Sequence, residues 1–227
     1  INCHEAASIE STGHKILGLP NTDGKLTSRQ IAACAAEYYE GGAPEYLTEP
    51  KLVYISFPTE QGTLYSKREL RAISEVCKKY GMYLFVDGAR MGYGLGAEDN
   101  DLTLKDFAEL TDVFYIGGTK CGALFGEALI ITEPRLQYRF KAYMKQHGAV
   151  LAKGWLMGLQ FALMLESGER IDVNWRCYPT TFTSSAQTGR EVDDWGQRLS
   201  IRVFASEKVY DNIMEQAAKL LKREKAC

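Results

Sequence analysis

Several common signatures are missing from this chain of 227 residues, and each absence narrows what the protein can be. The sequence has no internal repeat, no zinc-ligand spacing, no P-loop and no nucleophile elbow for a Ser/His/Asp arrangement. No apolar run approaches the roughly 20 residues of a membrane span. We expect no signal peptide, because no charged segment followed by an apolar segment opens the sequence. The six cysteines are Cys3, Cys34, Cys77, Cys121, Cys177 and Cys227. They form no CxxC pair, so we expect reduced thiols in a cytoplasmic protein rather than structural disulfides.

A strong charge of either sign is also missing. The net charge is −2, which gives no electrostatic reason to expect a nucleic acid or an anionic membrane as a partner. The chain is 45% hydrophobic and 25% charged, the composition of an ordinary globular protein. Its length suits one large domain, or one domain and part of another.

The most informative stretch that is present runs over residues 82–120. Two short apolar runs, 82–86 and 112–116, have the nearly continuous hydrophobicity of parallel strands that are covered on both faces. The segment 102–110 between them has apolar residues at helical spacing, which predicts a β-α-β unit. The first strand ends at Asp87 and the second is followed by Lys120, so both ionisable side chains should lie at the ligand-binding edge of the sheet.

Further elements complete an α/β pattern. A third strand is predicted over 51–57, and right-handed crossovers would place the three strands side by side in a parallel sheet. A capping box, Ser66 with Glu69, begins a helix that should stop at Gly81. The other predicted elements are a helix capped at Thr27 and ending near Tyr39, a strand within 123–131, and a long helical region over 135–165.

An aspartate and a lysine at one sheet edge suit pyridoxal 5'-phosphate. The lysine amine can bond to the aldehyde of the cofactor, and the carboxylate can keep the pyridine nitrogen protonated. A solvated lysine and an Asp-Gly turn are the ordinary alternatives for these residues. The spacing alone leaves both interpretations open.

Four longer strings resemble the threonine aldolase and β-eliminating lyase family of fold-type I pyridoxal-phosphate enzymes. They are PTEQGTLYS (58–66), YLFVDGARMGYGL (83–95), DVFYIGGTKCGALFGEALII (112–131) and KQHGAVLAKGWLMGLQF (145–161). The likeness is almost continuous over 1–165 and returns near 195–222. It implies a three-layer sandwich with a mostly parallel central sheet and helices on both faces. Residues 1–165 would form the large cofactor-binding domain, and 166–227 a reduced α+β remnant of the small C-terminal domain.

The resemblance also implies which residues bind the cofactor. Lys120 would bond to its aldehyde, and Asp87 would hold the pyridine nitrogen. Arg90 would contact the cofactor or the substrate carboxylate, Thr119 would donate its hydroxyl to the phosphate, and Gly118 would let the backbone approach. The sequence shows no counterpart of the Gly-rich phosphate-binding turn that precedes this region in the family, and we expect some tens of residues to be missing before Ile1.

Two further residues are implied for the substrate. Glu5 stands where the family has a glutamate near the substrate hydroxyl, although Ala6 and Ala7 replace the usual glycine there. Arg202 matches the arginine that binds the substrate carboxylate, a task suited to a guanidinium group, although Val203 departs from the family pattern after it.

The implied activity is cleavage of a β-hydroxy-α-amino acid, such as threonine to glycine and acetaldehyde. Small amino acids would be the substrates, and the protein would be a homodimer or homotetramer whose active sites are completed across an interface. The sequence leaves open the side chain of the substrate and whether cleavage is aldol or eliminative. The alternative is a truncated or degenerate member that lacks catalysis and serves only in assembly.

Overall fold

A computed structural model of the chain describes residues 1–166. The predicted C-terminal remnant, the boundary that precedes it and Arg202 therefore stay predictions, because residues 167–227 lie outside the described range.

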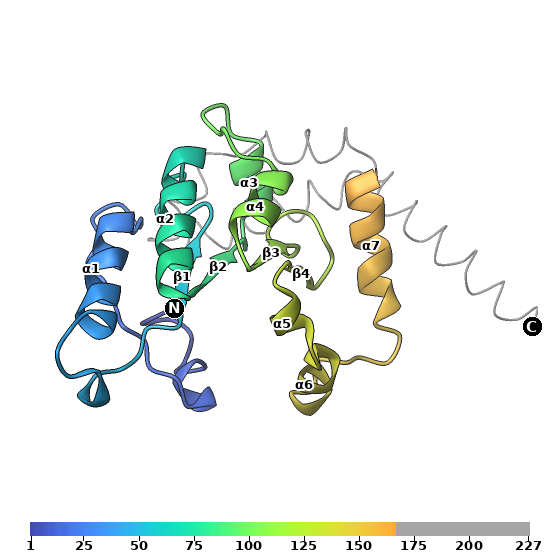
Figure 1. Cartoon of the computed structure of the whole chain (residues 1–227). Helices are drawn as coiled ribbons and strands as arrows, with labels where there is room; N and C mark the ends of the chain where they lie inside the picture. Colours follow the sequence, from blue (N-terminus) through green and yellow to red (C-terminus); the bar gives the residue numbers. More distant parts are fainter. Residues whose placement is uncertain (167–227) are drawn as a thin grey trace, which may run out of the picture.

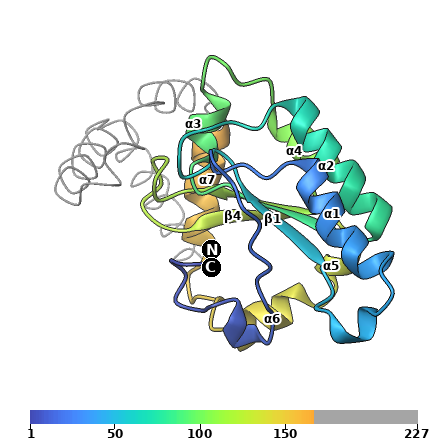
Figure 2. The same cartoon turned by 90° about the vertical axis from the view of Figure 1, so that its left-hand side faces the viewer.

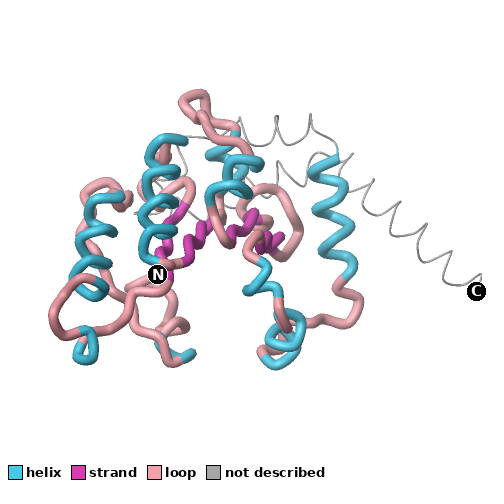
Figure 3. The backbone as a smooth tube through the Cα atoms, in the orientation of Figure 1, coloured by secondary structure: helices cyan, strands magenta, loops and turns pink. Residues whose placement is uncertain are grey.

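The centre of the fold is a four-stranded sheet in the order β1 (Leu52–Ser56), β2 (Tyr83–Asp87), β3 (Val113–Gly117) and β4 (Glu127–Ile131). The first three strands are parallel, as the sequence predicts, and β4 runs antiparallel to β3. The C-terminal ends of β1, β2 and β3 and the first residue of β4 therefore share one edge of the sheet. Figure 3 shows the strands together in the middle of the molecule, with helices around them.

Helices α1 (Ser28–Tyr39), α2 (Lys67–Tyr80) and α4 (Leu104–Leu110) follow one another along the same side of the sheet, over β1 to β3 (Figure 1). The side chains of every second strand residue point to these helices and form the core with them. On the strands these buried residues are Val53, Ile55, Leu84, Val86, Phe114 and Ile116. The alternate strand residues, on the other face, are mostly only half-buried.

The predicted helix signals are confirmed. The hydroxyl of Ser66 accepts from the Glu69 amide over 3.3 Å, and Glu69 accepts from the Ser66 amide over 2.8 Å. Thr27 begins α1 with a capping box of the same kind. Gly81 ends α2 with φ +64°, a left-handed conformation that glycine adopts without strain.

The region predicted as one long helix over 135–165 is divided into three. Its helices are α5 (Pro134–Gln137), α6 (Phe140–Gln146) and α7 (Trp155–Glu166). The breaks have a backbone cause, because Arg139, Gly148 and Lys153 all have positive φ and cannot continue a right-handed helix. Figures 1 and 2 show α7 beside β4, away from α1.

Three short elements complete the described fold. A short helix, α3 (Met91–Leu95), follows β2 and packs on β3. Two 3-10 turns, η1 (Glu10–Thr12) and η2 (Pro44–Tyr46), lie in the connecting segments. Within residues 1–166, no helix is long and apolar enough to cross a membrane.

Candidate active site

Asp87, the last residue of β2, is held from both neighbouring strands. The hydroxyl of Tyr54 on β1 donates to its Oδ2 atom, and the hydroxyl of Tyr115 on β3 donates to its Oδ1 atom. The amide of Ala89 also donates to Oδ1, over 2.9 Å. Because side chains alternate along a strand, the two tyrosines and Asp87 all lie on the half-buried face, opposite α2 and α4.

Both tyrosines remain neutral hydrogen-bond donors. Burial raises the pKa of Tyr54 and Tyr115 far above the usual value for a phenol, and the hydrogen bonds to the Asp87 carboxylate raise these pKa values further. A neutral phenol donates to a carboxylate but cannot neutralise it. The two hydroxyls therefore orient Asp87 as an anion and leave it able to bind a cationic group.

Two strand-end turns lie against each other at this edge. We call residues 87–91 the aspartate turn and residues 117–121 the lysine turn. The amide of Gly117 donates to the carbonyl oxygen of Gly88 over 2.8 Å. A Cβ atom on Gly88 would lie 1.8 Å from the carbonyl oxygen of Tyr115, and one on Gly117 would lie 2.1 Å from that of Ala89. Only glycine fits at either position, so the two turns are fixed together through their backbones.

Lys120 lies in the lysine turn with an exposed side chain. Its carbonyl oxygen accepts a 2.7 Å hydrogen bond from the hydroxyl of Tyr93 on α3. The charges of Lys120 and Asp87 both act on the carboxylate of Glu127, the first residue of β4. The structure therefore places Lys120 at the same edge as Asp87.

Gly118 and Thr119 are both linked to Glu127. The Gly118 amide donates to Glu127 Oε2 over 2.7 Å. The exposed side chain of Thr119 lowers the pKa of this carboxylate. A Cβ on Gly118 would lie 2.2 Å from the carbonyl oxygen of Gly126, so backbone packing already requires a glycine there. Burial raises the pKa of Glu127, and the Gly118 amide and the Lys120 charge oppose this shift.

Arg90 and Glu5 lie near the same edge. Arg90 is the half-buried residue before α3, and its charge acts on the buried thiol of Cys121, whose pKa burial raises to about 11. Glu5 is exposed, and its charge acts on the Tyr115 phenol, which bonds Asp87. The described candidates thus gather around the two turns, while their roles in binding and catalysis remain predictions.

Four residues of this site were not identified from the sequence: Tyr54, Tyr93, Tyr115 and Glu127. Tyr54 and Tyr115 lie within apolar strand segments, where a tyrosine does not stand out. The alternation of side chains along a strand gave a weak signal, because each tyrosine lies between two buried residues and so points to the opposite face of the sheet. Glu127 reaches the site because β4 pairs with β3, and Tyr93 reaches it from the short Gly-rich helix α3. Local sequence patterns predict neither of these contacts.

Thr59 and Glu60 follow β1 at the same sheet edge. Thr59 is fully buried and its hydroxyl lies 2.6 Å from that of Thr63, so it stabilises the turn after β1. Glu60 accepts a 2.9 Å hydrogen bond from Ser56, the residue that pairs with Asp87 across the sheet. Glu60 therefore lies beside the site without a contact to Asp87 or Lys120 among the described hydrogen bonds.

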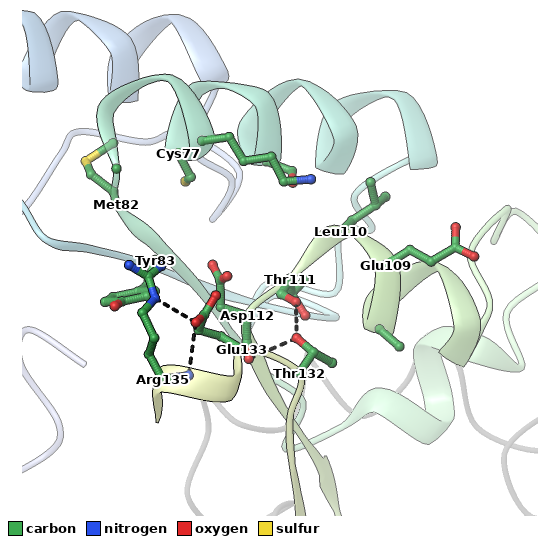
Figure 4. Close-up of a pocket in the computed structure, with 14 residues that line it drawn as sticks. Cys77, Met82, Tyr83, Glu109, Leu110, Thr111, Asp112, Thr132, Glu133 and Arg135 are labelled. Atoms are coloured by element: carbon green, nitrogen blue, oxygen red, sulfur yellow. Dashed lines mark hydrogen bonds and ion pairs between the residues drawn. The ribbon is translucent and has the colours of Figure 1, made fainter. Parts of the chain in front are cut away.

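A pocket of about 390 Å³ opens at the opposite end of the strands, where β2 and β3 begin (Figure 4). Arg135 donates to Glu133 over 2.7 Å, and Asp112 accepts the amide of Leu84 over 2.7 Å. These lining groups already have protein partners, and the pocket is remote from both turns. It does not contribute to the candidate site.

Comparison with known protein families identifies the family to which this chain is related. A sequence model of the family described as β-eliminating lyase matches residues 2–193. The chain belongs to the β-eliminating lyase family. The two turns and all four strands fall inside the matched range.

The chain is also similar to proteins named low specificity L-threonine aldolase. It is 33% identical over 179 residues to one from a Pseudomonas species, covering 73% of this chain and 50% of that protein. It is 34% identical over 164 residues to one from Pseudomonas aeruginosa, covering 66% of this chain and 45% of that protein.

Among solved structures it is similar to the Leishmania major threonine aldolase. The TM-score is 0.72 at 47% identity, and the match covers 76% of this chain and 49% of that one. This neighbour supports the predicted fold-type I class. The chain spans about half the length of each of these relatives.

Proposed function

We propose that this member of the β-eliminating lyase family is a pyridoxal-phosphate-dependent lyase that cleaves a β-hydroxy-α-amino acid to glycine and an aldehyde. The observation that carries the proposal is the placement of Asp87 and Lys120 in two turns joined by a backbone hydrogen bond at one sheet edge. The similarity to proteins named threonine aldolase supports this substrate class.

The residues present fit the cofactor. The Asp87 carboxylate, held by Tyr54 and Tyr115, would bind the protonated pyridine nitrogen. The exposed amine of Lys120 would bond to the aldehyde carbon, and Thr119 next to it would donate to the phosphate. When bound, pyridoxal phosphate withdraws electrons from the substrate carbon that carries the amine.

The protein would supply orientation and proton transfer around that carbon. Arg90, together with Arg202 from outside the described residues, would bind the substrate carboxylate through paired guanidinium hydrogen bonds. Glu5 would accept the proton of the substrate hydroxyl as the bond between the α and β carbons breaks. Its exposure at the rim is compatible with contact to a substrate that enters from solvent.

The proposed assembly is a homodimer or homotetramer. Several large apolar side chains are exposed between α5 and α7, with Tyr138 76% and Leu151 57% accessible. Exposed groups of this kind commonly mark protein interfaces. Light scattering of the purified protein would test this, and a monomer at all concentrations would contradict it.

Aldehyde release tests the activity. The protein is incubated with pyridoxal phosphate and L-threonine, and acetaldehyde is measured with a coupled dehydrogenase. We expect release from the unmodified chain, none from Lys120→Ala, and ordinary release from Lys141→Ala, which removes another exposed lysine. Equal release from Lys120→Ala would contradict the proposed function. A protein that stays colourless with added cofactor would instead support the non-catalytic alternative.

A further inference from the structure

Glu127 connects β4 to the lysine turn. It is the first residue of β4 and pairs with Gly117, the last residue of β3. Its carboxylate accepts a hydrogen bond from the amide of Gly118 over 2.7 Å. The side chain of Glu127 thus binds the backbone two residues before Lys120.

The carboxylate also lies among the charges of the site. The positive charge of Lys120 lowers the pKa of Glu127 and the negative charge of Asp87 raises it, although burial is the largest influence. In turn, the charge of Glu127 raises the pKa of Tyr115 and of Cys121. Glu127 therefore faces β2 and β3 as well as the turn it binds.

The lysine turn is held at its other end by a different element. The hydroxyl of Tyr93 on α3 donates to the carbonyl oxygen of Lys120 over 2.7 Å. Gly118 has no room for a side chain because the backbone at Gly126 would lie 2.2 Å from its Cβ. The backbone of residues 118–120 is therefore confined on three sides, and Glu127 supplies the only one of these contacts that carries a charge.

We propose that Glu127 is a positioning residue that holds the backbone of residues 118–120. This inference rests on the proposed function, because it concerns how Lys120 meets an aldehyde. Glu127 itself would not react. Its carboxylate would keep the lysine turn in one conformation.

Amide exchange tests the proposal without any cofactor. Glu127→Ala should increase the hydrogen exchange rate of the Gly118 amide by about tenfold, the effect of losing one hydrogen bond. Glu127→Gln keeps a carbonyl acceptor and should stay within about threefold of the unmodified protein. Glu109→Gln is the matched control, since Glu109 lies exposed on α4 and pairs with Lys105 at 3.7 Å. Unchanged exchange in Glu127→Ala would overturn the proposal. If that variant fails to fold, Glu127→Asp decides, because its shorter side chain should also lose the hydrogen bond from the Gly118 amide.

Aldehyde capture tests what this position does for Lys120. Pyridoxal phosphate bound to Lys120 is fixed with borohydride after a series of mixing times and measured by peptide mass spectrometry. In Glu127→Ala capture should be about tenfold slower than in the unmodified protein, because the lysine turn is no longer held in one conformation. In Glu127→Gln capture should stay within about threefold of the unmodified protein, because a carbonyl acceptor for the Gly118 amide remains.

Equal capture rates in Glu127→Ala and in the unmodified protein would overturn the positioning role at Lys120. The proposed function and the proposed role of Glu127 are contradicted by different results. If Lys120 captures no aldehyde in the unmodified chain, the proposed function fails, and the amide exchange of Gly118 still decides whether Glu127 holds the turn.

Discussion

The amide of Gly117 donates to the carbonyl oxygen of Gly88 over 2.8 Å, and this hydrogen bond joins the turn after β2 to the turn after β3. A side chain on Gly88 would meet the backbone of β3 at Tyr115, and one on Gly117 would meet the aspartate turn at Ala89. The distance between the candidate aspartate and the candidate lysine is therefore set by main-chain packing rather than by flexible side chains.

Substitution of either glycine should damage the fold and the site together. Gly117→Ala and Gly88→Ala should each reduce the free energy of unfolding by more than about 3 kcal/mol, because the clash is with backbone that cannot move aside. Urea unfolding measures the change. Gly158→Ala on α7 is the control, since its Cβ meets nothing within 4 Å and it should be neutral or stabilising. A loss below 1 kcal/mol for Gly117→Ala would contradict the packing described above.

The two phenols at Asp87 should titrate abnormally. Carbon-13 NMR of the tyrosine rings, assigned with Tyr54→Phe and Tyr115→Phe, should show both ionising well above the ordinary value near 10. Asp87→Asn should move both midpoints downward, because a neutral neighbour no longer opposes a phenolate, although burial keeps them raised. Asp99→Asn, at an exposed site, should move neither. Ordinary titration of both rings in the unmodified protein would mean that they do not bind Asp87.

Asp106 should contribute stability that depends on pH. Its carboxylate lies 2.6 Å from the Lys67 amine and also accepts from Thr103. These interactions lower its pKa from 3.8 to about 2. Stability from this group is therefore complete above pH 4 and is lost as the pH falls from about 4 to about 2, because the unfolded chain takes up the proton first.

Asp106→Asn should cost about 2 kcal/mol at pH 7, with the difference from the unmodified protein shrinking below pH 4. Urea unfolding at several pH values measures this. Glu109→Gln, which removes an exposed pair on the same helix, should cost less than about 0.5 kcal/mol. A loss from Asp106→Asn that is equal at pH 3 and pH 7 would contradict the ion pair as its source.

An alanine-to-glycine substitution should stabilise the protein at Ala7 and destabilise it at Ala33. Ala6 and Ala7 have φ values of 49° and 56°, a left-handed backbone that costs roughly 1–2 kcal/mol for a residue other than glycine. Ala7→Gly should therefore stabilise the segment that carries Glu5 and slow the exchange of its amides. Ala33→Gly, exposed within α1, should destabilise by about 1 kcal/mol. Faster exchange in Ala7→Gly would show that the backbone there is not left-handed.

Much of the fold follows from local signals in the sequence. Ser66 and Glu69 fix the start of α2, Gly81 fixes its end, and the apolar runs before Asp87 and Lys120 identify two parallel strands. The two alanines after Glu5 stand where glycine is usual in the family, and the structure gives them the left-handed backbone that glycine would adopt.

What the sequence could not show depends on contacts between distant segments. Tyr54 and Tyr115 reach Asp87 only because β1 and β3 flank β2, and Glu127 reaches Gly118 only because β4 turns antiparallel to β3. The division of residues 135–165 into three helices depends on single backbone conformations at Arg139 and Lys153, which side-chain periodicity does not reveal.

The central claim is that Asp87 and Lys120 bind one molecule of pyridoxal phosphate. The most direct measurement is to mix the protein with this cofactor, reduce the mixture with borohydride and map the labelled peptide by mass spectrometry. We predict label on Lys120, no label at that peptide in Lys120→Ala, and at least tenfold weaker retention in Asp87→Asn, because the pyridine nitrogen loses its charged partner. Label on a different lysine of the unmodified protein, or undiminished label in Lys120→Ala, would contradict the account.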